Sequence, residues 1–157
     1  MSKVALKRKV ARGAVIGAVL VVSAAMAFSA LAAATVTIDS AAKLVAKGSG
    51  VTVTGTVTCS YATLGQLLHN FSDQDTLTVS VSEKTGQGVA HGSTTLAGPP
   101  CDGSSHPWST SVPADNPARP FRAGNGAATA FYTACALSNG VCVETQQGSA
   151  SATVKIS

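Results

Sequence analysis

Residues 50–60 read Gly-Val-Thr-Val-Thr-Gly-Thr-Val-Thr-Cys-Ser, and this stretch decides the fold class. Successive side chains of a β-strand point to opposite faces of a sheet, so a period of two separates its residues into two faces. Apolar residues occupy one face here and threonines occupy the other: Val51, Val53, Val57 and Cys59 against Thr52, Thr54, Thr56 and Thr58. This alternation predicts a strand with one buried and one solvated face, which is typical of antiparallel sheets.

The same alternation recurs along the chain and predicts six further strands. They are expected at residues 35–40, 76–83, 87–95, 106–112, 127–135 and 141–156, the last of them broken near 146–149. Gly, Pro, Asn and Asp separate these segments, and no strand alternates with a helical pattern as in βαβ proteins. We therefore predict an all-β domain, an antiparallel immunoglobulin-like β-sandwich of seven or eight strands. A closed barrel is the alternative.

The first 34 residues have the organisation of a secretory signal peptide. Five basic residues precede an uncharged, mostly aliphatic run over residues 13–31, and small residues follow it. A basic start, an apolar stretch and a small-residue exit are the three regions of such a signal. We predict a signal helix at residues 1–34, cleavage after Ala32 or Ala34, and a single secreted, extracellular domain at residues 35–157. The apolar run is also long enough to span a bilayer, so a retained membrane anchor is the alternative.

Removal of the signal changes the charge of the chain. The whole sequence has a net charge of +4, but five of its 11 Lys and Arg residues lie in the signal segment. The remaining domain has six basic and seven acidic residues, a net charge of −1, and no basic cluster. Because binding to nucleic acid depends on clustered Lys and Arg that neutralise phosphates, a nucleic-acid partner is excluded. We expect a monomer with an unidentified extracellular or cell-surface partner.

Four cysteines follow the signal segment: Cys59, Cys101, Cys135 and Cys142. Thiols of exported proteins become oxidised, and no CxxC spacing indicates a zinc site, so we expect two disulfides. Asn139-Gly140 can form a tight hairpin turn, which would bring Cys135 and Cys142 together across two strands. The predicted pairs are therefore Cys59–Cys101 and Cys135–Cys142. The alternative, Cys59 with Cys135, would resemble the inter-sheet bridge of antibody domains.

Two segments outside the predicted strands form the candidate ligand surface. The first has apolar residues at the helical spacing i, i+3, i+4, i+7: Leu64, Leu67, Leu68 and Phe71. It can form a short helix, a loop at the edge of the core, or an exposed apolar patch. The second follows the proline-rich stretch 113–120 and contributes Arg119, Phe121 and Arg122. This stretch is either a stiff connection between strands or a loop that presents a binding surface.

Three residues could support catalysis or metal binding if the fold brought them together: His91, Asp102 and His106. No GxSxG motif marks a nucleophile, and no two histidines have the spacing of metal ligands on a helix or a strand. We therefore expect no catalytic residues, no metal and no cofactor, and predict a non-catalytic binding or structural module. A small secreted hydrolase or metal-dependent enzyme that uses these three residues is the alternative.

Several short motifs occur in an order that resembles a known family. They are Gly55-Thr56-Val57-Thr58-Cys59, Val79-Ser80-Val81-Ser82, Gly86-Gln87-Gly88-Val89-Ala90-His91-Gly92, Cys101-Asp102-Gly103 followed by Trp108, Pro120-Phe121, and the late Cys-x6-Cys hairpin. In these motifs the chain resembles small secreted immunoglobulin-like proteins of actinobacteria that have no assigned biochemical function. The resemblance implies a sandwich fold and secretion, and it supplies no catalytic residues. A fainter resemblance is to the apo-chromoproteins of the neocarzinostatin type, which are secreted sandwiches with two disulfides.

Overall fold

The computed structural model describes residues 34–61, 74–86 and 88–157. The predicted signal segment, except Ala34, lies outside the described residues, as do Leu64, Leu67, Leu68 and Phe71. Most of the described chain is β-strand: β1 (Thr35–Val36), β2 (Ala41–Val45), β3 (Gly50–Ser60), β4 (Thr76–Thr85), β5 (Gly88–Ala97), β6 (Asp102–Pro113), β7 (Gly124–Ser138) and β8 (Val141–Ile156). A short 3₁₀ helix, η1 (Ala46–Gly48), joins β2 to β3. Among the residues described, no helix has the length and hydropathy needed to cross a membrane.

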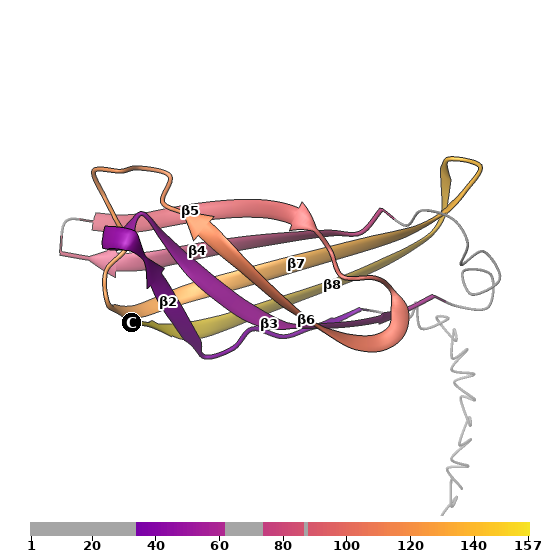
Figure 1. The fold of residues 1–157 in the computed structure, drawn as a ribbon, viewed down its shortest axis with the longest axis horizontal. Coiled ribbons are helices and arrows are strands. Elements are labelled where there is room, and N and C mark those ends of the chain that lie inside the picture. Colours follow the sequence, from indigo (N-terminus) through magenta and orange to yellow (C-terminus); the bar gives the residue numbers. More distant parts are fainter. Residues whose placement is uncertain (1–33, 62–73, 87) are drawn as a thin grey trace, which may run out of the picture.

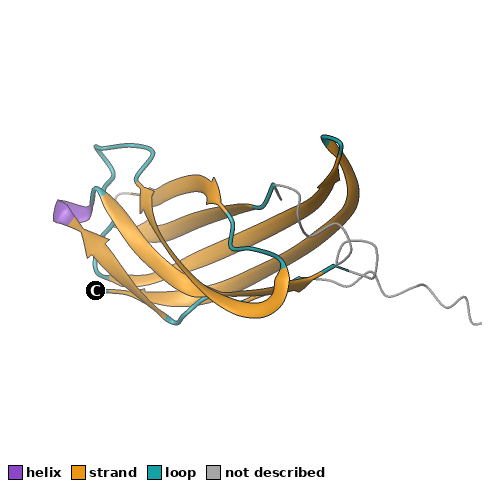
Figure 2. Cartoon of the chain, turned by 45° about the vertical axis from the view of Figure 1, so that its right-hand side comes forward, coloured by secondary structure: helices purple, strands orange, loops and turns teal. Residues whose placement is uncertain are grey.

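The eight strands form one mixed sheet that is not closed, so the alternative of a closed barrel is wrong. Their order is β1-β3-β2-β8-β7-β4-β5, and β6 pairs with β3. β3 pairs with β6 along its length, with β1 near its C-terminal end and with β2 at its N-terminal end. Figures 1 and 2 show β3 and β6 crossing β4, β7 and β8 at an angle.

One pairing departs from the predicted antiparallel arrangement. β2 runs antiparallel to β3, but its first residues, Ala41 and Ala42, pair in parallel with Lys155 and Ile156 of β8. β2 therefore connects the strands around β3 to the strands around β8. The alternation within a single strand carries no information about the direction of its partner, so the sequence pattern could not predict this pair.

A single hydrophobic cluster includes the inward side chains of all the long strands. The predicted inward residues of β3 and β4 are buried: Val51, Val53, Val57, Leu77, Val79 and Val81. Tyr132 of β7 is the largest fully buried side chain, and its hydroxyl donates a hydrogen bond to the Pro99 carbonyl at 2.8 Å. Each buried Val or Leu contributes roughly 1.5–3 kcal/mol through the hydrophobic effect. Since most of the cluster is Val and Ala, the core is built from small side chains.

The predicted strands are confirmed with some changes of boundary. β3 has the predicted bounds, and β4 to β7 overlap the predicted segments. The predicted break near 146–149 is wrong, because β7 pairs continuously with this part of β8, from Ala134↔Gln146 to Phe131↔Ser149. The first predicted strand, 35–40, is assigned as strand only at Thr35–Val36, although Thr37 and Asp39 still donate backbone hydrogen bonds to β3.

Both predicted disulfides are confirmed. Cys59 is bonded to Cys101 and Cys135 to Cys142, and no described cysteine is free. Asn139 and Gly140 have φ angles of 52° and 78°, so the two central residues of the turn are left-handed, as a tight hairpin turn requires. The alternative pair Cys59–Cys135 is therefore wrong.

Gly55 of β3 lies in close contact with Trp108 of β6. Trp108 is its partner in the register, and the indole ring lies over the glycine. A Cβ atom at Gly55 would come within 2.8 Å of the ring and would also collide with the Thr37 carbonyl oxygen. The glycine is therefore required here to give the ring room.

Candidate functional site

The three residues of the predicted catalytic alternative do not meet. His106 Nε2 lies 2.8 Å from Asp102 Oδ1, and both residues belong to β6. His91 of β5 instead pairs with a residue that the sequence did not suggest, since its Nδ1 lies 2.7 Å from Asp115 Oδ2. The structure thus forms two separate imidazole–carboxylate pairs.

The topology explains this separation. The His91 carbonyl accepts a hydrogen bond from the Asp115 N–H, which places His91 beside the C-terminal end of β6 at Pro113. His106 lies seven residues before Pro113 on the same strand, which corresponds to roughly 23 Å of extended chain. Within the described residues, no three His, Cys, Asp or Glu side chains group together as a metal site would require.

The pKa of the Asp102 carboxyl is clearly shifted. The hydrogen bond from His106 lowers the pKa of its carboxyl below its usual value of 3.8, and the backbone N–H of Ser104 lowers it further. The hydrogen bond from Ser104 is 2.8 Å long. Asp102 accepts hydrogen bonds from both groups, so its best-supported role is to orient the half-buried imidazole of His106.

The three residues of the second predicted ligand segment, Arg119, Phe121 and Arg122, differ in their exposure. Arg119 and Arg122 are exposed, but Phe121 is only 2% exposed and belongs to the hydrophobic cluster. Its N–H donates to the Gly48 carbonyl of η1 at 2.9 Å, and this bond holds the segment over the end of the core. Phe121 is therefore a core residue, and only Arg119 and Arg122 of this segment present their side chains at the surface.

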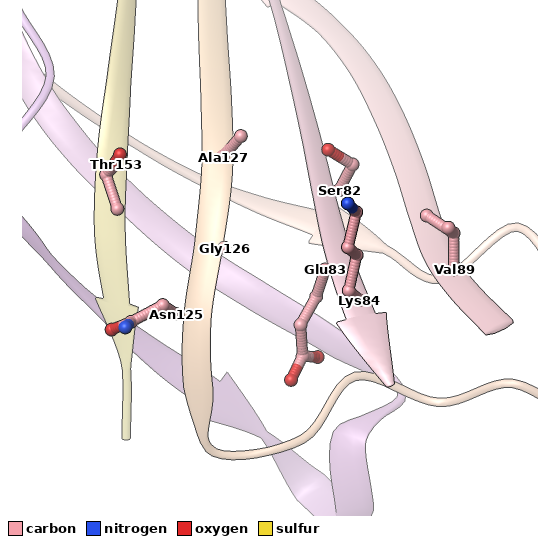
Figure 3. A pocket seen from close by; sticks show the side chains of 8 residues that line it. All are labelled: Ser82, Glu83, Lys84, Val89, Asn125, Gly126, Ala127 and Thr153. Atoms are coloured by element: carbon pink, nitrogen blue, oxygen red, sulfur yellow. The ribbon is translucent and has the colours of Figure 1, made fainter. Parts of the chain in front are cut away.

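Glu83 anchors the same connection from the other side. Its side chain is 4% exposed, and Oε2 accepts the backbone N–H of Arg122 at 2.8 Å. Figure 3 shows the Glu83 carboxylate near the connection that enters β7, away from the Lys84 ammonium. The inward alternation of β4 could have predicted this burial, but its partner could not be predicted.

Four neighbouring strands carry a regular array of exposed side chains. The strands are β5, β4, β7 and β8 in this order, and they lie side by side in Figure 2. Their register places alternate residues in four rows: Ala97, Thr76, Thr133, Gln147; Thr95, Thr78, Phe131, Ser149; Ser93, Ser80, Thr129, Ser151; and His91, Ser82, Ala127, Thr153. We call this array the hydroxyl grid, because eleven of its sixteen positions are Ser or Thr and none is Asp, Glu, Lys or Arg.

Phe131 is the one aromatic residue of the grid. It is 48% exposed, whereas its neighbour Tyr132 faces the opposite way and is fully buried. The residues directly across from Phe131 are Thr78 and Ser149, both too short to cover the ring. The alternation of β7 predicted the opposite orientations of Phe131 and Tyr132, and the structure confirms them.

Two hollows border β7 between Asn125 and Thr129. The smaller, of about 110 Å³, is bordered by Ser80, Val81, Ser82, His91, Ala127 and Thr129. The larger, of about 450 Å³, is shown in Figure 3, where its lining side chains come from β4, β5, β7 and β8. Ser82 and Ala127 border both hollows, so the two lie next to each other at the last row of the grid.

The outward face of β3 has a different composition. Its threonines are also in cross-strand hydrogen bonds, with Thr37 Oγ1 2.7 Å from Thr56 Oγ1 and Thr54 donating to Asp39. A hollow of about 420 Å³ on this face is bordered by Asp39, Ala41, Ala42, Lys43, Thr52, Thr54, Ser109 and Ser157. This face therefore combines hydroxyls with charges, whereas the hydroxyl grid combines hydroxyls with an aromatic ring.

No protein-family model matches the chain, and a comparison with curated proteins gives no significant match.

Proposed function

We propose that this chain is a secreted, non-catalytic binding module that acts as a monomer outside the cell. The observation that carries the proposal is the contrast between its surfaces. Its two described histidines each pair with a single carboxylate, whereas the hydroxyl grid is a broad, ordered face without Asp, Glu, Lys or Arg. A face of this kind suits recognition of a partner better than chemical transformation of a substrate.

We propose an immunoglobulin-like sandwich as the scaffold of this module. In such a fold, two groups of strands pack through their inward faces with their directions at an angle. β3 and β6 cross β4, β7 and β8, and the two groups contribute side chains to one cluster. The order of motifs that resembles secreted actinobacterial immunoglobulin-like proteins supports the same proposal.

Secretion is supported by two independent features. The first 34 residues have the three regions of a signal peptide, and the chain that follows them contains two disulfides. Ala34 is buried and donates a backbone hydrogen bond to the Gln147 carbonyl at 3.0 Å. Of the two predicted cleavage sites, the one after Ala32 preserves this bond, so we propose Ala33 as the first residue of the secreted protein.

The test begins with the full chain expressed in a secreting host. Intact-mass measurement of protein from the medium is expected to give a chain that starts at Ala33. The purified protein is then assayed on ester, peptide and phosphoester substrates, with and without zinc, manganese, magnesium or calcium ions. No turnover is expected. Turnover that disappears in the His106→Ala variant would overturn the proposal in favour of the hydrolase alternative, and full-length chain in the membrane fraction would overturn secretion.

A further inference from the structure

We propose that the hydroxyl grid binds a neutral polysaccharide and that Phe131 stacks against a sugar ring. This inference rests on the proposed binding function and names the chemical class of its ligand. Three properties of the grid lead to it: the absence of charge, the density of hydroxyls and the position of the aromatic ring.

The charge of the grid selects a neutral partner. No Asp, Glu, Lys or Arg occupies any of its four rows; His91, in the last row, is paired with the Asp115 carboxylate, and Lys84 and Lys155 follow that row. A polyanion such as nucleic acid would gain little from a surface without cations. A charged protein surface would lose hydration on contact with this face without gaining an ion pair. A neutral polymer incurs neither cost.

The hydroxyls of the grid can form hydrogen bonds with a partner that is rich in hydroxyls. Each Ser or Thr offers one donor and two acceptor positions, and its hydroxyl hydrogen rotates to suit its partner. Two cross-strand pairs, Thr78–Thr95 and Ser80–Ser93, bring their oxygens to 2.9 Å from each other. Thr129, Ser149 and Ser151 are exposed around Phe131. A sugar has the same capacity to donate and to accept at each hydroxyl, so the two surfaces are complementary.

Phe131 supplies an apolar contact at a defined place in this polar field. The ring has short neighbours on both sides, Thr78 and Ser149, and it is about half exposed. An aromatic ring presents an electron-rich face, which attracts the weakly positive C–H groups of a sugar ring. Sugars expose such C–H groups on the faces of the ring and hydroxyls around its edge. The arrangement of one aromatic ring surrounded by hydroxyls therefore matches one sugar residue.

The adjacent hollows indicate an extended ligand. They border β7 from Thr129, the next outward residue after Phe131, to Asn125, and Glu83 and Lys84 also line the larger one. From Phe131 to Asn125 the strand extends over roughly 20 Å. Ala127 lies midway and is small, which leaves the hollow open. A chain of several sugars can lie along this path, so a polysaccharide fits better than a single sugar.

The experiment measures depletion of the secreted protein from solution by insoluble cellulose and by insoluble chitin, which are neutral. Soluble carboxymethylcellulose serves as an anionic probe. Binding to at least one neutral polymer is expected, with little dependence on salt concentration. Phe131→Ala is expected to weaken it at least tenfold, whereas Phe131→Trp retains it. Val143→Ala is the matched control, because Val143 is 51% exposed and lies outside the grid.

A second pair of variants compares binding by the hydroxyl grid with binding by the outward face of β3. Thr129→Val removes one hydroxyl beside Phe131 and is expected to weaken binding by about two- to tenfold, the range for one hydrogen bond. Thr58→Val makes the same change at an exposed position on β3 and is expected to have no effect. Circular dichroism must show that every variant is folded.

Four outcomes would overturn the inference. They are failure to bind either neutral polymer, binding that Phe131→Ala does not weaken, a preference for carboxymethylcellulose that salt abolishes, and a protein dimer that Phe131→Ala dissociates. The last would assign the grid to a second copy of this chain. Absence of polymer binding without turnover would reject the polysaccharide and leave the non-catalytic module standing, so the two proposals fail in different ways.

Discussion

The two disulfides lie in regions of opposite character. Cys59–Cys101 joins the end of β3 to the residue before β6, and both cysteines are only 2% exposed within the hydrophobic cluster. Cys135–Cys142 lies in a two-stranded ribbon, residues 134–138 and 141–146, which continues beyond the last residue of β7 that pairs with β4. The ribbon exposes Val141 and Val143.

This difference shows that a disulfide can stabilise either the tertiary fold or a local structure. Cys59–Cys101, which we call the body bridge, joins two cysteines that are 42 residues apart in sequence, and no local turn brings them together. Cys135–Cys142, which we call the ribbon bridge, joins residues seven apart across a hairpin whose turn is formed by Asn139-Gly140. The first bond therefore supports the tertiary fold, and the second reinforces a local structure.

The largest expected effect is removal of the body bridge. Cys59→Ala with Cys101→Ala should lower the free energy of unfolding by about 2–5 kcal/mol, since closing a loop of this length is worth about 4 kcal/mol in the chain-entropy model. Urea denaturation followed by circular dichroism measures the loss. A loss smaller than that of the ribbon double variant would contradict the comparison.

Removal of the ribbon bridge should have a smaller effect. Cys135→Ala with Cys142→Ala is expected to cost about 1–3 kcal/mol, because the closed loop is short and is worth about 2.4 kcal/mol in the same model. Hydrogen exchange should show faster opening confined to residues 134–146. Faster exchange throughout β3 and β6 would mean that the ribbon supports the body, contrary to this interpretation.

The addition of a single methyl group at Gly55 tests how tightly β3 and β6 are packed. Gly55→Ala is expected to cost about 1–3 kcal/mol, because the new Cβ collides with the Trp108 ring and the Thr37 carbonyl. Gly86→Ala is the matched control, since a Cβ there meets nothing within 4 Å. The control should change stability by less than about 0.5 kcal/mol or raise it slightly. Thermal unfolding of both variants measures the difference, and equal losses would show that steric contact is not the cause.

The smallest expected effect concerns the exposed pair at the start of β6. His106→Asn should raise the pKa of the Asp102 carboxyl toward 3.8, because the hydrogen bond from His106 is the largest cause of its lowering. A depressed carboxyl pKa stabilises the fold above pH 3.8, and this contribution disappears as pH falls through the folded-state pKa. An NMR titration of the Asp102 side chain measures the shift. An unchanged titration would assign the lowering to Ser104 alone.

The strands could be predicted where alternation is strict, and the ribbon bridge where the turn is specified locally. β3 alternates Val and Thr, and its predicted bounds are confirmed. Asn139-Gly140 predicted the turn and hence the Cys135–Cys142 pair. In both cases, the information lies within a few neighbouring residues.

The remaining features depend on partners far apart in sequence. β2, with the sequence Ala-Ala-Lys-Leu-Val, has no clear alternation, and its strand pairs with both β3 and β8. Phe121 is buried because its backbone bonds to Gly48, more than 70 residues earlier. The outward orientation of Phe131 follows from the local pattern, but its place in a grid of hydroxyls depends on the register of four strands.

Under the proposed secretion, the parallel pair between β2 and β8 also determines when the chain can finish folding. Ala41 and Ala42 pair with Lys155 and Ile156, which lie at the other end of the described chain. A chain that crosses a membrane amino end first would release β2 long before these partners emerge, and β3 would likewise wait for β6. Such distant pairings form slowly. The translocating chain would therefore remain unfolded while it crosses the membrane, and its sheet would assemble only after β8 had crossed.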